Sequence, residues 1–290
     1  MAARIAVAAG NTLGEGPHWD AAAVALYWVD IVERQVWRWH PASDARCVWP
    51  LPESVSAVFP RRGGGLLVTL ASGIAFLSEH GAVERWVAPD PVAGNRANDA
   101  RCDAAGRLWL GTMQNNIGPQ KEDLPVTRAT GGLFRIDPDG TVTRWAEGVG
   151  ITNALAFSPD GKRLTFADSE ANRIDIFDVD PASGTLANRR RFVEGGPGVP
   201  DGGTMDAEGC LWNARFGASR LIRYRPDGSV EREVPLPCAQ PTSCVFGGPD
   251  LRTLYITSAR VGMAQPGPAD GALLELAVDV PGLQAHPFAG

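Results

Sequence analysis

Asp103-Ala-Ala-Gly-Arg-Leu-Trp109 and Asp206-Ala-Glu-Gly-Cys-Leu-Trp212 are two copies of one pattern, a turn that leads into an apolar strand. The same order of turn and strand recurs in Asp20–Val29, Arg61–Leu70, Pro159–Ala167 and Pro249–Thr257. The six units start near residues 20, 61, 103, 159, 206 and 249, at intervals of 41, 42, 56, 47 and 43 residues. A repeat of this period is typical of folds in which similar units pack side by side.

A second series, of strand–turn–strand hairpins, alternates with the first. In Gly131–Trp145, apolar residues flank Arg135 and a Pro-Asp-Gly turn follows, which are hairpin signals. The other hairpins in the series are Val36–Trp49, Gly73–Val87, Arg173–Val193, Arg220–Val234 and Ala272–Phe288. Each repeat therefore contains about four short strands, as a propeller blade does.

These two series predict an all-β fold, a six-bladed β-propeller with four-stranded antiparallel blades around a central channel. One such domain would occupy residues 1–290. We expect the spare strand Arg4–Ala8 to join the last blade and close the ring, which also removes an exposed edge. An irregular β-sandwich is the alternative. The longest interval contains the polar loop Met113–Gly131, and a loop of that length predicts a lid over one mouth of the channel.

Composition narrows the classes of function. The net charge of −6 and the absence of any Lys/Arg run longer than three residues argue against nucleic-acid and anionic-membrane partners. The five cysteines form no CxxC motif and are an odd number, which indicates reduced thiols in a cytoplasmic protein. The N-terminus has the pattern of a strand and lacks a signal-peptide h-region, and no apolar run approaches the roughly 18 residues that span a bilayer. We expect a soluble, cytoplasmic protein that acts on a small molecule.

The repeat also shows which residue each unit presents at one position. About five residues before each turn lies a polar, oxygen-bearing side chain: Glu15, Ser56, Asn98, Asn153, Asp201 and Ser243. In a propeller these positions meet at the start of the innermost strands, around the axis. Two carboxylates there would repel each other unless a cation or proton lay between them. Carboxylate and amide oxygens together predict a hard, oxygen-rich site for one divalent cation. Taken singly, each of these residues could equally be a turn former.

Several motifs, in order along the chain, resemble the regucalcin/gluconolactonase family, which includes senescence marker protein and luciferin-regenerating enzyme. They are Leu13–Pro17, Arg96–Asp99, Gly111–Met113, Ile151–Gly161, Pro200–Gly202 and Phe246–Asp250. The resemblance covers residues from about 11 to about 260. It implies a six-bladed propeller that binds a metal through Glu15, Asn153 and Asp201. It also implies that Arg96 and Asn98 bind substrate oxygens, and that the activity is the opening of aldonolactones such as gluconolactone, xylonolactone or arabinonolactone.

One departure from the family pattern concerns the substrate. Members that bind sugar lactones can carry a Glu shortly after Gly-Thr-Met, and Asn116 lies at that place in this chain. Its amide can hydrogen-bond a sugar hydroxyl but supplies no charge, so we group Asn116 with Arg96 and Asn98 as substrate-binding and expect an altered hydroxyl preference.

The chemistry that we expect is hydrolysis of a sugar lactone to the aldonic acid by a metal-activated water, with polarisation of the carbonyl. Asp201 is the expected general base, and Arg96 is placed to neutralise the developing oxyanion. Oxygen ligands favour Ca²⁺, while Zn²⁺, Mn²⁺, Mg²⁺ and Fe²⁺ remain compatible. Two alternatives stay open: a non-enzymatic calcium-binding propeller, and a metal-dependent hydrolase of another ester or of a phosphotriester.

Other polar and aromatic residues receive structural interpretations. Alternation along a strand turns Asp99 away from the axis, and Thr152 is interpreted as an ordinary strand residue. The four histidines lack zinc-site spacing, and His18 is expected to pack within its strand. The nine tryptophans are expected to pack between blades.

Overall fold

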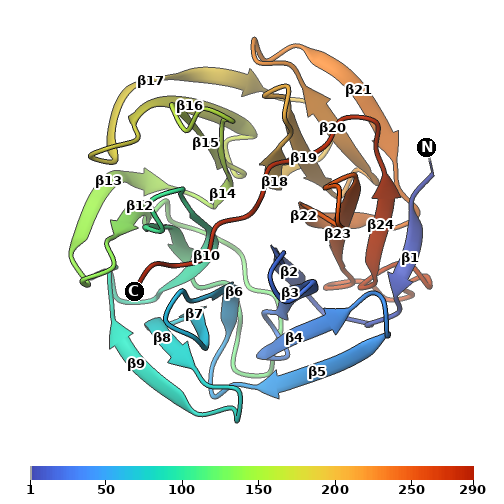
Figure 1. Ribbon diagram of the computed structural model, residues 1–290, viewed down its shortest axis with the longest axis horizontal. Coiled ribbons are helices and arrows are strands. Elements are labelled where there is room, and N and C mark those ends of the chain that lie inside the picture. Colours follow the sequence, from blue (N-terminus) through green and yellow to red (C-terminus); the bar gives the residue numbers. More distant parts are fainter. Residues whose placement is uncertain (1) are drawn as a thin grey trace.

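The computed structural model describes residues 2–290, which form six four-stranded antiparallel sheets arranged as a ring (Figure 1). Each sheet is one blade, and the first strands of neighbouring blades contact one another around the axis. This architecture confirms the six-bladed β-propeller that the repeat predicted. The described residues contain no α-helix, and hence no helical segment with the length and hydropathy that a bilayer crossing requires.

Within each blade the strands run antiparallel and follow one another from the axis outward. Blades 1 to 3 are β2 (Gly14–Asp20), β3 (Ala25–Asp30), β4 (Gln35–His40) and β5 (Ala45–Pro50); β6 (Val55–Pro60), β7 (Leu66–Leu70), β8 (Gly73–Leu77) and β9 (Val83–Val87); and β10 (Asn95–Cys102), β11 (Leu108–Gln114), β12 (Gly131–Ile136) and β13 (Val142–Val149). Blades 4 to 6 are β14 (Thr152–Phe157), β15 (Arg163–Asp168), β16 (Arg173–Asp180) and β17 (Thr185–Glu194); β18 (Val199–Met205), β19 (Leu211–Phe216), β20 (Arg220–Tyr224) and β21 (Val230–Pro235); and β22 (Gln240–Gly247), β23 (Thr253–Ala259), β24 (Leu273–Ala277) and β1 (Arg4–Val7).

The N-terminal strand closes the ring, as predicted. β1 pairs antiparallel with β24, with Arg4 opposite Glu275 and Ile5 opposite Leu274, and so becomes the outer strand of blade 6. The predicted hairpin Ala272–Phe288 is wrong in its second half, because β24 ends at Ala277 and its outer edge is already paired with β1.

The segment that follows β24, residues 279–290, crosses one end of the ring instead (dark red in Figure 1). We call it the tail. It is fixed at its far end by Phe288, whose side chain is fully buried and whose amide donates to Pro60 O at 2.9 Å. Burial of that ring against blades 2 and 3 explains why the chain leaves the sheet.

The hydrophobic core is divided into six clusters, one at each interface between neighbouring blades. Trp28, Trp109 and Trp212 are almost completely buried in three of these clusters. The prediction that tryptophans pack between blades is therefore confirmed for these three. Because apolar side chains fill the interfaces, the axis itself is left to polar groups.

The duplicated Asp–Trp pattern forms the same hydrogen-bonded turn in blades 3 and 5. The Asp103 carboxylate accepts from Trp109 Nε1 at 3.0 Å and from Arg107 Nε at 2.7 Å. The Asp206 carboxylate accepts from Trp212 Nε1 at 2.9 Å and from an arginine Nε, that of Arg223, at 2.8 Å. Each Asp is thus a buried acceptor that fixes the turn between the first two strands, which explains the recurrence of the sequence pattern.

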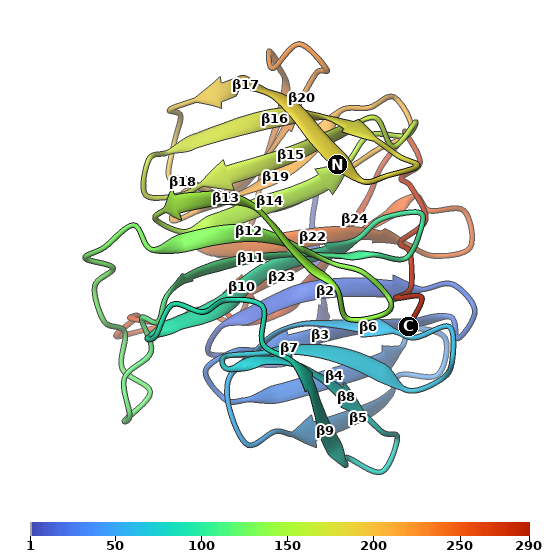
Figure 2. The same ribbon diagram turned by 90° about the vertical axis from the view of Figure 1, so that its left-hand side faces the viewer.

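The two ends of the channel are structurally different. The green β11–β12 connection extends from one face of the ring, and the C-terminal end lies toward the opposite face (Figure 2). We call the end where β10 begins the lid mouth and the end crossed by the tail the tail mouth.

Candidate metal and substrate site

Each of the four acidic or amide residues of the predicted set lies beside a β-bulge of an innermost strand. The pairing register shifts in β2, β10, β14 and β18, next to Glu15, Asn98, Asn153 and Asp201. A bulge adds one residue to a strand and so re-aims the neighbouring side chains. The bulges therefore explain how residues of a regular sheet can point along the axis toward the lid mouth.

The backbone after two of these residues adopts a left-handed conformation. Gly16 follows Glu15 and Ala154 follows Asn153, and both have a φ of 53°. At Gly16 a Cβ would lie 2.6 Å from Ser56 O, so a side chain has no room. Ala154 adopts the same conformation with a side chain, at a cost of about 1–2 kcal/mol. Strain of this kind gathers at functional sites.

The six predicted metal and substrate residues line one cavity at the lid mouth, with a volume of 330 Å³. They are Glu15, Arg96, Asn98, Asn116, Asn153 and Asp201. Residues 121–126 of the β11–β12 loop also line this cavity, and Lys121 Nζ forms an ion pair with Glu33 of blade 1. The loop thus lies against the mouth in the position of the predicted lid.

A chain of hydrogen bonds joins three blades at the base of this cavity. Asn98 Nδ2 donates to Asn153 Oδ1 at 3.2 Å, and Asn153 Nδ2 donates to Ser169 Oγ at 2.9 Å. Ser169 Oγ in turn donates to Pro200 O at 2.6 Å, directly before Asp201. Because its Nδ2 is bound on the Ser169 side, Asn153 keeps its Oδ1 directed toward the cavity.

Arg96 is 3% exposed and organises the substrate side of the cavity. Its Nη1 donates to Asn98 Oδ1 at 2.7 Å, and its Nε and Nη2 both donate to Asn116 Oδ1, at 3.1 and 2.8 Å. Asn116 Nδ2 donates to Asp123 Oδ1 at 3.1 Å. Asn116 therefore connects a buried guanidinium to a carboxylate of the lid.

The two carboxylates of the site are strongly perturbed. Burial, together with the charge of Asp99, raises the pKa of Glu15 to about 8, against a hydrogen bond from Gly16 N at 2.9 Å and the charge of Arg96, which lower it. Burial followed by the charges of Glu15 and Asp99 raises the pKa of Asp201 well above its usual value. Burial lowers the pKa of Arg96 to about 10, although the carboxylates around it oppose that shift. The two carboxylates, those of Glu15 and Asp201, are therefore stable together only when they share a proton or a cation.

The donor groups fit a hard divalent cation. One oxygen each of Glu15 and Asp201 accepts from the next backbone amide, which leaves the other oxygen without a hydrogen bond among the described residues. With Asn153 Oδ1 they form an oxygen-only set. Across the part of the chain that the structure describes, no cluster of three or more His, Cys, Asp or Glu side chains could hold a metal. A cation at the lid mouth would therefore use two carboxylates, amide oxygens and water.

The two serines that occupy the same position in the other blades have different surroundings. Ser56 and Ser243 are buried but do not line this cavity, and Ser56 Oγ lies 2.8 Å from Thr69 Oγ1. Asp99 accepts from the amides of Ala100 and Leu155, at 2.8 Å in both cases, in agreement with its structural interpretation. His18 is buried and packs edge-on against Phe59, and burial lowers its pKa to about 3.

Two residues of the site were not predicted from the sequence. Ser169 lies outside the innermost strands, so the repeat gave no reason to align it with the others. Asp123 belongs to the long loop, where only its charge and the loop's length were signals.

A ring of six blades with two carboxylates and two amides at one end of its axis defines a propeller with an axial oxygen-donor site. The chain belongs to the SMP-30/Gluconolactonase/LRE-like family, which it matches over residues 13–260, and this confirms the resemblance noted in the sequence.

Three relatives illustrate the similarity. The chain is 36% identical to 6-deoxy-6-sulfogluconolactonase of Pseudomonas putida, over 97% of this chain and 96% of the relative. It is 38% identical to L-arabinolactonase of Azospirillum brasilense, over 90% of this chain and 85% of the relative. The crystal structure of regucalcin from Agrobacterium tumefaciens, described as a calcium-binding protein, superposes with a TM-score of 0.89 at 30% identity, over 99% of this chain and 97% of that one.

Proposed function

We propose that this protein is a sugar lactonase that hydrolyses an aldonolactone to the aldonic acid and depends on one divalent cation. The observation that carries the proposal is the pair of buried carboxylates, Glu15 and Asp201, beside Asn153 at the base of a 330 Å³ cavity lined with hydrogen-bonding groups. Two relatives of almost the full length, named as a sulfogluconolactonase and an arabinolactonase, support the substrate class.

Glu15, Asn153 and Asp201 would hold the cation. When bound, a divalent cation polarises a carbonyl oxygen and lowers the pKa of a coordinated water. The oxygen-only set favours Ca²⁺, and the similarity to a regucalcin described as calcium-binding supports that preference. Zn²⁺, Mn²⁺, Mg²⁺ and Fe²⁺ stay compatible with a site completed by water.

Lactone hydrolysis forms a bond between a water oxygen and the carbonyl carbon and breaks the bond from that carbon to the ring oxygen. Asp201, which would also hold the cation, accepts the proton of the attacking water. The ring oxygen leaves as a hydroxyl group once it receives a proton. That proton then passes from Asp201 to the leaving ring oxygen.

Arg96 and Asn98 bind the substrate oxygens. The guanidinium is held by Asn98 and Asn116, so its charge is fixed next to the site where negative charge develops on the carbonyl oxygen. Asp123 supplies, from the lid, the negative charge that the amide of Asn116 lacks. We therefore propose that Asn116 and Asp123 together recognise a sugar hydroxyl.

The test is turnover of a panel of five- and six-carbon aldonolactones, followed as acid release at constant pH, with defined metals and with a chelator. Metal-dependent acid release from at least one sugar lactone is expected. The similarity to a calcium-binding regucalcin favours one second candidate, a calcium-binding propeller without enzymatic activity. Cation binding without acid release from any lactone would support that candidate and refute the lactonase.

A further inference from the structure

A second cavity opens at the tail mouth, at the other end of the innermost strands. Its volume is 260 Å³, and it lies between blades 3, 4 and 5 and the tail. β10 connects the two cavities, because Arg96 near its start lines the first and Arg101 near its end lines the second. The two residues are five positions apart, roughly 16 Å along an extended strand. We call the second cavity the tail pocket.

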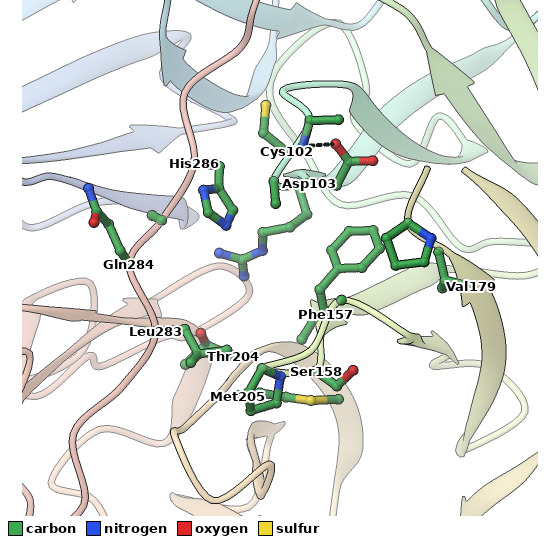
Figure 3. A pocket seen from close by; sticks show the side chains of 18 of the residues that line it. Cys102, Asp103, Phe157, Ser158, Val179, Thr204, Met205, Leu283, Gln284 and His286 are labelled. Atoms are coloured by element: carbon green, nitrogen blue, oxygen red, sulfur yellow. Dashed lines mark hydrogen bonds between the residues drawn. The ribbon is translucent and has the colours of Figure 1, made fainter. Parts of the chain in front are cut away.

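The walls of the tail pocket are mainly apolar, with polar groups distributed around them. Figure 3 shows Phe157 and His286 on opposite sides of the pocket, with Leu283 and Thr204 along a third. Met205 and Val179 complete the apolar wall. A cavity of about 150 Å³ lined by apolar groups admits benzene, so this pocket is large enough for a small ring.

Of the two arginines that line the pocket, Arg101 is the one with a guanidinium edge left open toward a ligand. Its Nε donates to Leu155 O at 3.0 Å and its Nη2 donates to Gly203 O at 2.7 Å. Within residues 2–290 its Nη1 makes no hydrogen bond, and no carboxylate lies within ion-pair distance of the guanidinium. The two backbone contacts fix the plane of the guanidinium, so the free edge has a defined direction.

The other arginine of the pocket is satisfied and serves as a comparison. Arg107 pairs with the Asp103 carboxylate at 2.7 Å, and its Nη2 donates to Pro181 O at 2.8 Å. The nearest acid along β10 from Arg101 is Asp99, whose two oxygens are already occupied by backbone amides. The charge of Arg101 therefore has no direct counter-ion.

The one carboxylate among the residues that line the pocket, that of Asp103, is paired with Arg107. Burial lowers the pKa of His286, and the positive charges of Arg62 and Arg101 lower it further, against the charge of Asp103. His286 is consequently neutral at pH 7. A neutral imidazole beside an uncompensated guanidinium is an environment that favours an anion.

We propose that the tail pocket binds a small monocarboxylate with an apolar body, with its carboxylate on the free edge of Arg101 and its body between Phe157 and Leu283. This site is separate from the proposed lactonase site and does not depend on it. The guanidinium supplies the charge-assisted hydrogen bond, and the apolar wall selects the body of the ligand.

Benzoate is the probe, and benzyl alcohol, which has the same ring and no charge, is its control. Binding is measured by NMR on the metal-loaded protein through the imidazole signals of His286, with the exposed His80 as the internal reference. We expect benzoate to shift the His286 signals in a saturable way and to raise the pKa of His286, because an anion nearby favours the imidazolium. The His80 signals should stay constant, and benzyl alcohol should bind at least about tenfold more weakly.

Two pairs of variants localise the binding. Arg101→Met should weaken benzoate binding about tenfold or more, and Arg101→Lys should weaken it less. Gln284 is exposed at the rim of the pocket, so Gln284→Glu and Gln284→Lys change its charge without touching the core. Gln284→Glu should weaken benzoate binding about threefold at low salt, and Gln284→Lys should strengthen it about threefold.

Three results would overturn the proposal. They are unchanged His286 signals at saturating benzoate, equal affinities for benzoate and benzyl alcohol, and displacement of benzoate by an aldonate that occupies the lid mouth. If Arg101→Met does not fold, the Gln284 pair decides alone, and equal affinities of its two members would also refute the site.

Discussion

Cation binding at the lid mouth should release protons, because Glu15 must ionise before it can act as a ligand. With a pKa of about 8, Glu15 is about nine-tenths protonated at pH 7 and about one-tenth protonated at pH 9. Binding of one cation at pH 7 should therefore release about 0.9 proton from Glu15. Asp201 adds to this release, since its pKa is raised as well.

The coupling between cation binding and proton release also sets how the affinity for the cation depends on pH. Below pH 7, where Glu15 is mostly protonated, the cation competes with a proton, and the dissociation constant should fall about tenfold for each unit of rising pH. The part of this dependence that comes from Glu15 ends above about pH 8. Glu15→Gln removes both the ligand charge and the proton, so it should weaken binding and reduce the release.

The assay is isothermal titration calorimetry of chelator-treated protein with Ca²⁺, in two buffers that differ in their enthalpy of protonation. The difference in apparent enthalpy gives the number of protons released. Glu79→Gln is the matched control, because Glu79 is exposed and does not line the cavity at the lid mouth. Absence of proton release at pH 7, or an affinity that is constant from pH 6 to pH 9, would refute this account of the site.

Three substitutions test the other assigned roles. Asp201→Asn should lower kcat by about 100-fold or more in steady-state assays while the protein stays folded, and wild-type turnover with cation bound would remove Asp201 from the mechanism. Asp123→Asn should raise KM for the preferred lactone about tenfold and leave kcat nearly unchanged, and an unchanged KM across the lactone panel would exclude Asp123 from substrate recognition. Asp206→Asn should lower the free energy of unfolding by about 1.5–3 kcal/mol in urea titrations, because Arg223 loses its one fully buried carboxylate partner and keeps only Glu208 and Glu231; a loss below about 0.5 kcal/mol would contradict that role.

The sequence repeat was sufficient to predict the ring and the gathering of four polar residues at one end of its axis. Equivalent positions of successive blades must meet around one axis, so a polar residue in phase with its counterparts is placed in space as well as in the chain. That is why the sequence alone groups Glu15, Asn98, Asn153 and Asp201, and all four line the cavity at the lid mouth.

Features that break the repeat could not be predicted in this way. The lid has no counterpart in other blades, so nothing in the pattern indicated that Asp123 contacts Asn116. The strand assigned to the end of the chain was wrong because the contact that fixes the tail, burial of Phe288 against blades 2 and 3, is made far away in sequence. The left-handed backbone at Ala154 likewise follows from its bulge and not from the residue type.

The most direct test of the central claim is the anomalous scattering of Mn²⁺ in crystals of the wild-type protein. We expect one dominant peak at the lid mouth, within about 2.6 Å of oxygens of Glu15, Asn153 and Asp201. A dominant peak elsewhere, or none at these residues at a saturating concentration of Mn²⁺, would contradict the claim that they hold a single cation.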